Sequence, residues 1–447
     1  MPHDHSHDDN NSHKTDSGEE EHVHYHGVDK AEEHIRVDQA LEMFLGQITP
    51  VKSEYVDLGR ANQRVIYEDI RSPMDLPALP RSTRDGFAVS FSGDEAPSGS
   101  RFSIVGDIPI GVIPKISLEE GQAVRIATGS YAPKGACSVL MKEYAKVEGD
   151  SLEFERTLRR SENVLKPGED IARGKTLLHK GSVLLPTHIA LLAMLGYARV
   201  KVYRKPRIAF FSTGDELVDL QASSSSSARK KGPRIYDANR PFIASMLENL
   251  GAETEDLGIA KDNFSSIRSK MLLGLRRFDG LILSAGSSVG ERDFVAKAEE
   301  SISGVKVLVH GVAMRPSSPT GLATYRGRPF ISLPGFPTSA IVSFFVFARP
   351  AISKLAGREI LEDYPIVRAR LLDEYSGKKG IRHFLRVDLT KDKSSGEYVA
   401  RIVRPSEAQF SGWLSEANGL AIIDEERGSV KINDEVPVLV FGNVPLD

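Results

Sequence analysis

Apolar and polar positions alternate most regularly between residues 207 and 357. Residues 207–213 (RIAFFST) form an apolar run typical of a buried strand, and residues 239–251 (NRPFIASMLENLG) repeat apolar positions every three or four residues, which predicts a helix closed by Gly251. Strands that alternate with helices in this way indicate a parallel, doubly wound sheet with helices on both faces. Further strands and helices are expected at 253–260, 264–278, 279–285, 294–302, 305–314, 328–335 and 338–357.

Two segments lack the apolar positions that a core requires. Residues 1–33 contain seven of the twelve histidines, many acids and almost no aliphatic side chains, so we expect this tail to be disordered. Its alternating histidines suit loose binding of zinc, nickel or copper, and the alternative is a tail that only improves solubility. Residues 221–233 (QASSSSSARKKGP) are typical of a flexible loop inserted in the sheet domain.

Length and composition set further limits. A chain of 447 residues is too long for one core and indicates three or four domains. The net charge of -3, with no basic stripe among aromatic residues, argues against nucleic-acid binding. Cys137 is the single cysteine, which excludes an intrachain disulfide and a zinc site built from cysteines. The N-terminus has no signal-peptide core and the apolar stretch 340–348 is short, so we expect a cytoplasmic protein that does not enter a membrane.

Five short segments rich in glycine, proline, serine or acid follow the predicted strands. Because ligands of parallel sheets bind at the carboxyl ends of the strands, we expect these segments to form one site. Glycine turns at helix N-termini offer backbone N–H groups to a phosphate. The segments are 213–217 (TGDEL), 236–240 (YDANR), 284–293 (SAGSSVGERD), 315–319 (RPSSP) and 333–337 (LPGFP).

Four acidic residues in these segments would repel a phosphate unless a cation lies between them. Carboxylate and phosphate oxygens are preferred ligands of hard divalent cations, so we expect Mg²⁺ at this site. The alternative for Asp237 and Asp293 is that each caps a helix. The four residues are Asp215, Glu216, Asp237 and Asp293.

Four of these segments, at 213–217, 236–240, 284–293 and 333–337, together with three earlier in the chain, resemble the motif series of the molybdopterin molybdenumtransferase family, which includes MoeA and the E domain of gephyrin. Outside the sheet domain the series continues with 81–89 (RSTRDGFAV), 125–143 (RIATGSYAPKGACSVLMKE) and 163–174 (NVLKPGEDIARG). Seven motifs in the family's order make the resemblance specific, and it spans residues 34–447.

The resemblance implies a multidomain α/β architecture. Residues 34–74 and 159–205 would form an elongated mixed domain, into which a β-rich domain of residues 75–158 is inserted. The α/β molybdopterin-binding domain would span 206–357 and a C-terminal β-barrel domain 358–447, for which the alternating pattern of the tail is independent support. Family members are homodimers whose cleft lies between the sheet domain of one subunit and the inserted domain of the other.

The family's reaction implies the substrates and the roles of residues. Members bind adenylylated molybdopterin, hydrolyse the adenylate with Mg²⁺, insert molybdate and release AMP, and the protein that adenylylates molybdopterin is a candidate partner. Asp85, Asp170, Asp237 and Asp293 match acidic family positions expected to act in catalysis, while Glu216, Asp237 and Asp293 would hold Mg²⁺. The positions expected to bind the substrates are Thr128, Thr213, Gly214, Asp215, Gly286, Ser287, Ser288, Gly290, Arg315, Ser318, Pro334 and Gly335.

Several positions depart from the family pattern. Ala285 replaces the first glycine of its loop, and Phe336 replaces the usual asparagine. Arg315, Ser317 and Ser318 stand where the family has lysine, glycine and lysine, so one positive charge for an oxyanion such as molybdate is lost. Two alternatives therefore stay open. One is a paralogue that only binds the pterin or handles tungstate, and the other is a scaffold that binds a protein without catalysis.

Overall fold

The structure of the chain is a computed structural model. The tail at 1–33 and the loop at 221–233, both predicted from composition, lie outside the described residues. The described residues are 34–220, 235–285, 289–358, 364–403 and 412–445, with the backbone alone described for 289–293.

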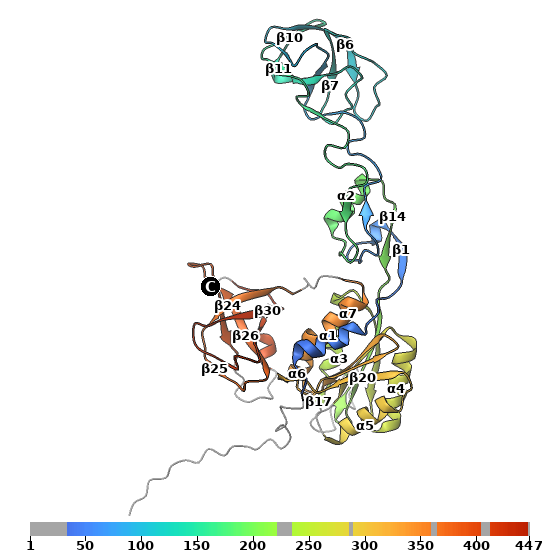
Figure 1. Cartoon of the computed structure of the whole chain (residues 1–447), viewed down its shortest axis with the longest axis vertical. Helices are drawn as coiled ribbons and strands as arrows, with labels where there is room; N and C mark the ends of the chain where they lie inside the picture. The colour runs from blue at the N-terminus through green and yellow to red at the C-terminus, as the bar shows by residue number, and fades with distance from the viewer. Residues whose placement is uncertain (1–33, 221–234, 286–288, 359–363, 404–411, 446–447) are drawn as a thin grey trace, which may run out of the picture.

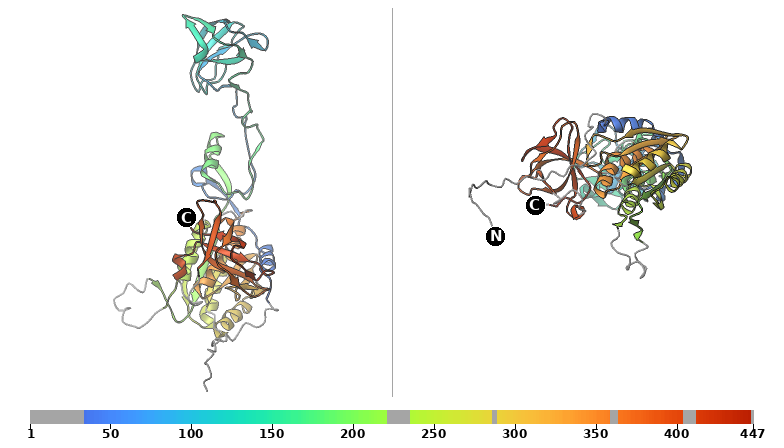
Figure 2. Two further views of the ribbon diagram at one scale, coloured as in Figure 1. Left: turned by 90° about the vertical axis from the view of Figure 1, so that its left-hand side faces the viewer. Right: turned by 90° about the horizontal axis from the view of Figure 1, so that it is seen from below.

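The molecule is elongated (Figure 1). The sheet domain and a C-terminal barrel lie at one end, a β-rich domain lies at the other, and a narrow region with helix α2 (Pro186–Met194) separates them (Figure 1 and the left view of Figure 2). The chain passes through the narrow region twice, where β1 (Ser53–Asp57) pairs with β14 (Arg199–Tyr203). The β-rich domain is therefore remote from the sheet domain of its own chain.

The sheet domain contains a six-stranded sheet of order β18-β15-β19-β23-β22-β20. Its first four strands are parallel, as predicted, whereas β22 and β20 are antiparallel to their neighbours. We did not predict β22, which a two-residue turn joins to β23: Arg326 and Gly327 have φ values of 54° and 79°, typical of a tight hairpin. The strands are β15 (Arg207–Thr213), β18 (Glu253–Ala260), β19 (Gly280–Ala285), β20 (Val305–His310), β22 (Gly321–Tyr325) and β23 (Arg328–Pro334).

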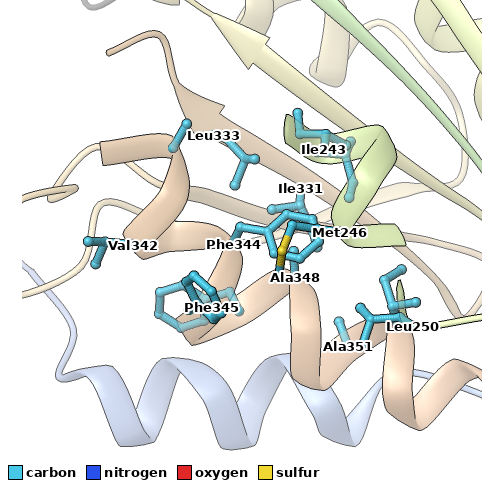
Figure 3. Packing of buried hydrophobic residues seen from close by; sticks show 14 of the residues in the cluster. Ile243, Met246, Leu250, Ile331, Leu333, Val342, Phe344, Phe345, Ala348 and Ala351 are labelled. Atoms are coloured by element: carbon cyan, nitrogen blue, oxygen red, sulfur yellow. The ribbon is translucent and has the colours of Figure 1, made fainter. Parts of the chain in front are cut away.

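Helices cover both faces of this sheet, as the sequence predicted. Side chains of α4 and α5 pack with β15 and β19 on one face, while α1, α3, α6 and α7 form a larger core on the other. In that core Ile243 and Met246 of α3 meet Phe344 and Ile331 (Figure 3). The helices are α1 (Val37–Gly46), α3 (Asn239–Asn249), α4 (Phe264–Arg277), α5 (Val289–Glu300), α6 (Pro337–Ser343) and α7 (Arg349–Leu355).

Two helices differ from their prediction. α5 begins at residue 289 rather than 294, because its first turn contains glycine and charged residues instead of the apolar repeat by which we recognised it. The last helix is interrupted between α6 and α7 by a π-helical turn, Phe344–Ala348. The whole helical stretch Pro337–Leu355 has the length and apolar character of a membrane span, but 78% of it is buried inside the fold. It therefore serves as a core helix.

The β-rich domain has its own six-stranded sheet, of order β8-β4-β7-β6-β10-β9, around a core that includes Phe87, Phe102, Leu140 and Phe154. The narrow region contains short strand pairs and a small core of its own that includes Ile66, Leu184 and Val202. The strands of the sheet are β4 (Gly86–Val89), β6 (Arg101–Ile108), β7 (Gln122–Ile126), β8 (Ser138–Met141), β9 (Ala145–Glu148) and β10 (Ser151–Phe154). The short pairs are β2 (Ile70–Arg71) with β13 (Thr176–Leu178) and β3 (Arg81–Ser82) with β12 (Val164–Leu165), whereas β5 (Glu95–Ala96) pairs with β11 (Leu158–Arg159) inside the β-rich domain, whose core includes Ala96 and Leu158.

The C-terminal domain is a closed five-stranded barrel, which confirms the prediction made from its alternating pattern. The pairing of β26 with β28 closes the sheet on itself. A short strand of the sheet domain, β21 (Met314–Arg315), joins the barrel by pairing with β26. The barrel strands are β24 (Ile366–Leu371), β26 (Arg382–Lys391), β27 (Tyr398–Ile402), β28 (Gly419–Ile423) and β30 (Glu435–Val440).

Candidate functional site

Three parallel strands end side by side at the carboxyl edge of the sheet. β15 ends at Thr213, β19 at Ala285 and β23 at Pro334. The register pairs Ser212 with Ser284 and Ala285 with Pro334, so the loops after these strands start from neighbouring positions, as the sequence predicted. Ala285 lies in the regular strand, where the methyl group that replaces the family's glycine needs no unusual backbone angle.

Asn239 joins two of these loops. Its side-chain amide donates hydrogen bonds of 2.7 Å to Ser284 Oγ and of 2.7 Å to the carbonyl of Gly335. Ser284 Oγ also lies 3.4 Å from the carbonyl of Pro334. Asn239 is buried, and a buried amide with these partners fixes the spacing of the loops. The sequence analysis did not select Asn239, although its position inside the segment 236–240 was a signal.

Asp237 is buried and hydrogen-bonded within its own helical turn. Its Oδ1 accepts from the backbone N–H groups of Asn239 (3.0 Å) and Arg240 (3.2 Å), and its Oδ2 accepts from Arg240 Nε at 2.7 Å. These contacts correspond to the helix-capping role that the sequence left open for Asp237. Both oxygens are engaged by the protein, and the carboxylate orients the N-terminus of α3.

Arg240 is the centre of a buried charge cluster that the sequence analysis missed. Besides Asp237, its guanidinium donates to Asp256 (2.7 Å) and to Asp219 (2.8 Å). Burial opposes the positive charge, but the hydrogen bonds to Asp256, Asp219 and Asp237 outweigh it and raise the pKa of Arg240. The three carboxylates come from separate elements, so their convergence could not be read from the spacing of the sequence.

The segment after β15 offers polar groups without protein partners. Thr213 Oγ1 is buried and has no hydrogen-bond partner among the described residues. Gly214 has a φ of 148°, and a Cβ there would approach the side chains of Glu216 and Leu217 to 2.9 Å, so this position requires glycine. The backbone N–H groups of Asp215 and Asp262 each donate to the carboxylate of the other residue. Glu216 is exposed, and its carboxylate accepts no hydrogen bond from a described residue.

Arg315 lies where the sheet domain meets the barrel. Its strand β21 pairs with β26 so that Arg315 is opposite His383, and Tyr375 donates to or accepts from His383 Nδ1 at 3.0 Å. Burial lowers the pKa of His383, and the nearby charge of Arg315 acts in the same direction. Arg315 itself is exposed and forms no ion pair with the described residues, so its guanidinium is available to an anion.

The two serines after Arg315 differ in their surroundings. Ser317 is buried with a φ of 88°, a region that favours the glycine expected at this position, and its Oγ donates to the carbonyl of Ser339 at 2.7 Å. Ser318 Oγ lies 3.3 Å from His34 Nδ1. Serine at 318 is therefore accommodated by hydrogen bonding and supplies no positive charge.

A second arginine, Arg386 of the barrel, stacks on an aromatic ring that contacts the start of α6. The guanidinium of Arg386 lies over the ring of Trp413, 5.5 Å from its centre, and Trp413 Nε1 donates to Thr338 Oγ1 at 2.9 Å. Burial lowers the pKa of Arg386. The barrel thus supplies an arginine beside the start of α6, where Phe336 is half exposed in place of the family's asparagine.

Of the predicted residues outside the sheet domain, Asp85 and Thr128 lie together in the β-rich domain, whereas Asp170 lies between β12 and β13. Asp85 Oδ1 accepts from the backbone N–H of Thr128 at 2.8 Å, and this hydrogen bond lowers the pKa of Asp85. Asp170 is exposed beside Leu76, whose carbonyl accepts from its backbone N–H at 3.2 Å. Because the narrow region lies between them and the sheet domain (Figure 1), one chain does not bring these residues to Asp237.

The remaining predicted positions lie in the loop after β19 and the first turn of α5. Gly286, Ser287 and Ser288 lie outside the described residues, as do the side chains of Gly290 and Asp293. Within the described part of the chain, no three His, Cys, Asp or Glu side chains are close enough to hold a metal ion. Of the three residues expected to hold Mg²⁺, Glu216 has a carboxylate without a partner among the described residues, and Asp237 has one engaged by Arg240.

Comparisons with known proteins agree across nearly the whole length. Residues 35–196 match the MoeA N-terminal region (domains I and II), residues 209–354 a probable molybdopterin-binding domain, and residues 368–441 the MoeA C-terminal region (domain IV). A molybdopterin molybdenumtransferase of Haemophilus influenzae is 30% identical over 92% of this chain and 99% of its own. One from Nostoc is 34% identical over 72% of this chain and 74% of its own.

Comparison of the fold with solved structures identifies the same family. The crystal structure of a molybdopterin biosynthesis MoeA protein from Pyrococcus horikosii superposes with a TM-score of 0.77, at 28% identity, and covers 92% of this chain and all of that one. Domain models, full-length relatives and structure therefore coincide. The chain belongs to the molybdopterin molybdenumtransferase family.

Proposed function

We propose that this protein is a Mg²⁺-dependent molybdopterin molybdenumtransferase of molybdenum cofactor biosynthesis. It hydrolyses adenylylated molybdopterin, inserts molybdate at the two sulfurs of the pterin and releases AMP. The proposal rests on the arrangement at the carboxyl edge of the sheet. There Asn239 joins the end of β19 to the loop after β23, both of which suit a phosphate, and Arg315 is exposed. A phosphate site and an anion site are thus adjacent, as a reaction that joins an adenylate to an oxyanion requires.

The loops after β15 and β23 supply the phosphate contacts. The orphaned hydroxyl of Thr213 gains a hydrogen bond when a phosphate oxygen approaches, which offsets the cost of burying it unpaired. Gly214 leaves the backbone uncovered for a close approach, and the loop of Pro334 and Gly335 is held in place by Asn239. Binding in this position directs the phosphate away from the apolar core and toward the acidic residues.

The donor set at this edge fits a hard divalent cation. Glu216 has a free carboxylate, and Asp293 lies in the first turn of α5, so these two with phosphate oxygens would hold Mg²⁺. Held there, the cation would supply neutralisation of the charge that develops on the departing AMP. Asp237 contributes differently, because its contacts with Arg240 and α3 make it a positioning residue as the site stands.

Arg315 is the residue that we assign to the oxyanion. Its planar guanidinium can donate to two oxygens of molybdate at once, and pairing of β21 with the barrel fixes its backbone. Ser318 gives the anion no charge, so Arg315 carries the larger share of the attraction. This arrangement favours, as the second candidate, a paralogue with altered handling of the oxyanion, including tungstate.

We propose a site completed by a second copy of the chain. Asp85, Thr128 and Asp170 are separated from the sheet by the narrow region of their own subunit. Helix α2 is rich in apolar residues but buries only Leu192, and Met194 is 66% exposed, which suits contact with another subunit. A homodimer with the inserted domain of one subunit over the sheet of the other brings both sets of residues to one cleft.

The test is an assay in which purified protein receives adenylylated molybdopterin and Mg²⁺, with molybdate or tungstate as the variable. Release of AMP that depends on molybdate supports the transferase, whereas equal or greater dependence on tungstate supports the second candidate. Binding of the pterin without release of AMP contradicts both and favours a non-catalytic scaffold. We place the reaction in the cytoplasm, with the protein that adenylylates molybdopterin as the supplier of substrate.

A further inference from the structure

A cavity of about 110 Å³ lies between α5 and the carboxyl edge of the sheet. Its wall combines Ala285, Ser332 and Pro334 at the strand ends with Glu299 of α5 and His310 of β20. Ala285 and Pro334 also begin the loops of the site described above, so the cavity is continuous with that edge. None of its polar side chains has a role in the reaction derived so far.

Glu299 brings an unpartnered carboxylate oxygen to this cavity. The residue is 3% exposed, and its Oε1 accepts from Ser332 Oγ at 3.1 Å. Its Oε2 has no hydrogen-bond partner among the described residues, and His310 Nε2 is 3.6 Å away, beyond hydrogen-bonding distance. A buried acceptor without a donor costs free energy, so a ligand that donates here gains more than it would at the surface.

The shape and chemistry of the cavity limit the ligand. Most of the remaining wall is apolar, including Ala296, Pro319 and Leu333. A phosphate or molybdate would be repelled by the carboxylate, and a hard cation would need several more oxygen ligands than this wall provides. A flat, largely apolar ring with N–H donors on one edge fits both the walls and the free oxygen.

We propose that this cavity receives the aminopyrimidinone edge of the pterin and that Glu299 accepts hydrogen bonds from its ring N–H and its exocyclic amino group. The inference rests on the proposed function, because that function supplies the pterin. A cavity of about 150 Å³ is known to hold one benzene ring, so this smaller cavity takes the edge of a ring while the remainder extends toward the strand ends. Glu299 is thus a specificity-determining residue, and the phosphate loops hold the other end of the substrate.

The test compares two free ligands by titration calorimetry. Pterin carries the amino group, whereas lumazine has a carbonyl oxygen in its place that faces the carboxylate. At about pH 8, where most of Glu299 is ionised because its pKa is about 7, the full-length wild-type protein is expected to bind pterin about 10- to 100-fold more tightly than lumazine, as the loss of a hydrogen bond to a charged group implies. Glu299→Gln should reduce that preference to about threefold or less, since an amide both donates and accepts.

Two further variants keep the result interpretable. Glu300→Gln changes the exposed neighbouring acid and should leave the preference intact. Ala296→Leu fills the cavity from α5 without removing Glu299 and should weaken the binding of both ligands. Equal affinity of the wild type for the two ligands, an unchanged preference in Glu299→Gln, or no pterin binding up to its solubility limit would each overturn the proposal.

Release of AMP separates this inference from the proposed function. A wild-type protein that discriminates between pterin and lumazine but never releases AMP keeps the cavity assignment and removes the transferase. A protein that releases AMP from adenylylated molybdopterin, with no discrimination that depends on Glu299, keeps the transferase and removes the cavity assignment.

Discussion

The carboxylate of Asp237, just before α3, is bound to the guanidinium of Arg240 in the first turn of that helix by a hydrogen bond of 2.7 Å in the buried interior. The other carboxylate oxygen accepts two backbone N–H groups at the start of α3. These contacts hold the turn that carries Asn239. The ion pair between Asp237 and Arg240 therefore also supports the spacing of Ser284 and Gly335, which Asn239 joins.

Asp237→Asn should destabilise the protein and impair the site together. Because Arg240 keeps its hydrogen bonds to Asp256 and Asp219, the expected cost is that of losing a hydrogen bond to a charged group, about 1.5–3 kcal/mol. Asp219→Asn is the matched control, since it removes a more exposed partner of the same arginine and should cost about 1 kcal/mol or less. Urea denaturation measures both. A Mg²⁺ titration of AMP release adds the second readout: if Asp237→Asn alone raises the half-saturating Mg²⁺ concentration without loss of stability, Asp237 is a ligand rather than a positioning residue.

Subunit exchange tests the composite site. Asp85→Asn and Glu216→Gln homodimers should each be almost inactive, whereas mixing them should restore part of the AMP release through heterodimers that hold one intact site. Mixing Asp85→Asn with Thr128→Val, which both alter the inserted domain, should restore nothing. Absence of recovery in the first mixture, after exchange has been verified by mass spectrometry, contradicts a cleft shared between subunits.

Molybdate dependence tests the role assigned to Arg315. Arg315→Ala should raise the half-saturating molybdate concentration by roughly 10- to 100-fold, as loss of a charge-assisted hydrogen bond implies. Ser318→Lys should lower it, because the variant restores a second positive charge. Arg368→Ala, which removes an exposed arginine of the barrel, is the control and should have no effect. If Ser318→Lys leaves the value unchanged or raises it, the anion lies elsewhere, with Arg386 as the next residue to alter.

Ser317 permits a separate measurement of backbone strain. A side chain in the left-handed region costs about 1–2 kcal/mol, which Ser317→Gly relieves while losing the hydrogen bond to Ser339. Ser317→Ala loses the same hydrogen bond but keeps the strain. The glycine variant should therefore be more stable than the alanine variant by about 1–2 kcal/mol in urea denaturation. Equal stabilities would falsify the strain at this position.

The stability of the sheet domain should depend on the protonation of Glu299. Burial raises the pKa of this carboxyl from 4.5 to about 7, so the folded state retains a proton that the unfolded state has lost. Its contribution is present in full below pH 4.5 and disappears as the pH rises through about 7. The free energy of unfolding should fall by roughly 3 kcal/mol over that range relative to Glu299→Gln. Denaturation curves of both proteins at about pH 5 and about pH 8 provide the measurement, and parallel behaviour of the two would contradict it.

The repeated apolar pattern was sufficient to predict the sheet domain, because each strand or helix buries one face and that burial is visible in the local sequence. The barrel was expected from the family resemblance, and the alternating pattern of the tail supported it. β22 escaped prediction because the turn at Arg326 and Gly327 has only one glycine to mark it. The site was predictable where residues follow strand ends. The cluster around Arg240 and the pairing of β21 with the barrel were not, since contacts between distant segments leave no local pattern.

The pairing of β21 with β26 also limits how the protein can be divided. Arg315 belongs to the sheet domain by sequence, yet its backbone is a strand of the barrel, and Arg382 of the barrel donates its backbone N–H to Ala313 at 2.9 Å. A sheet domain excised at residue 357 would keep the loops after β15, β19 and β23, while Arg315, which we propose to bind the anion, would lose its support. The proposed anion site therefore depends on both the sheet domain and the barrel, although Arg315 belongs to the sheet domain by sequence.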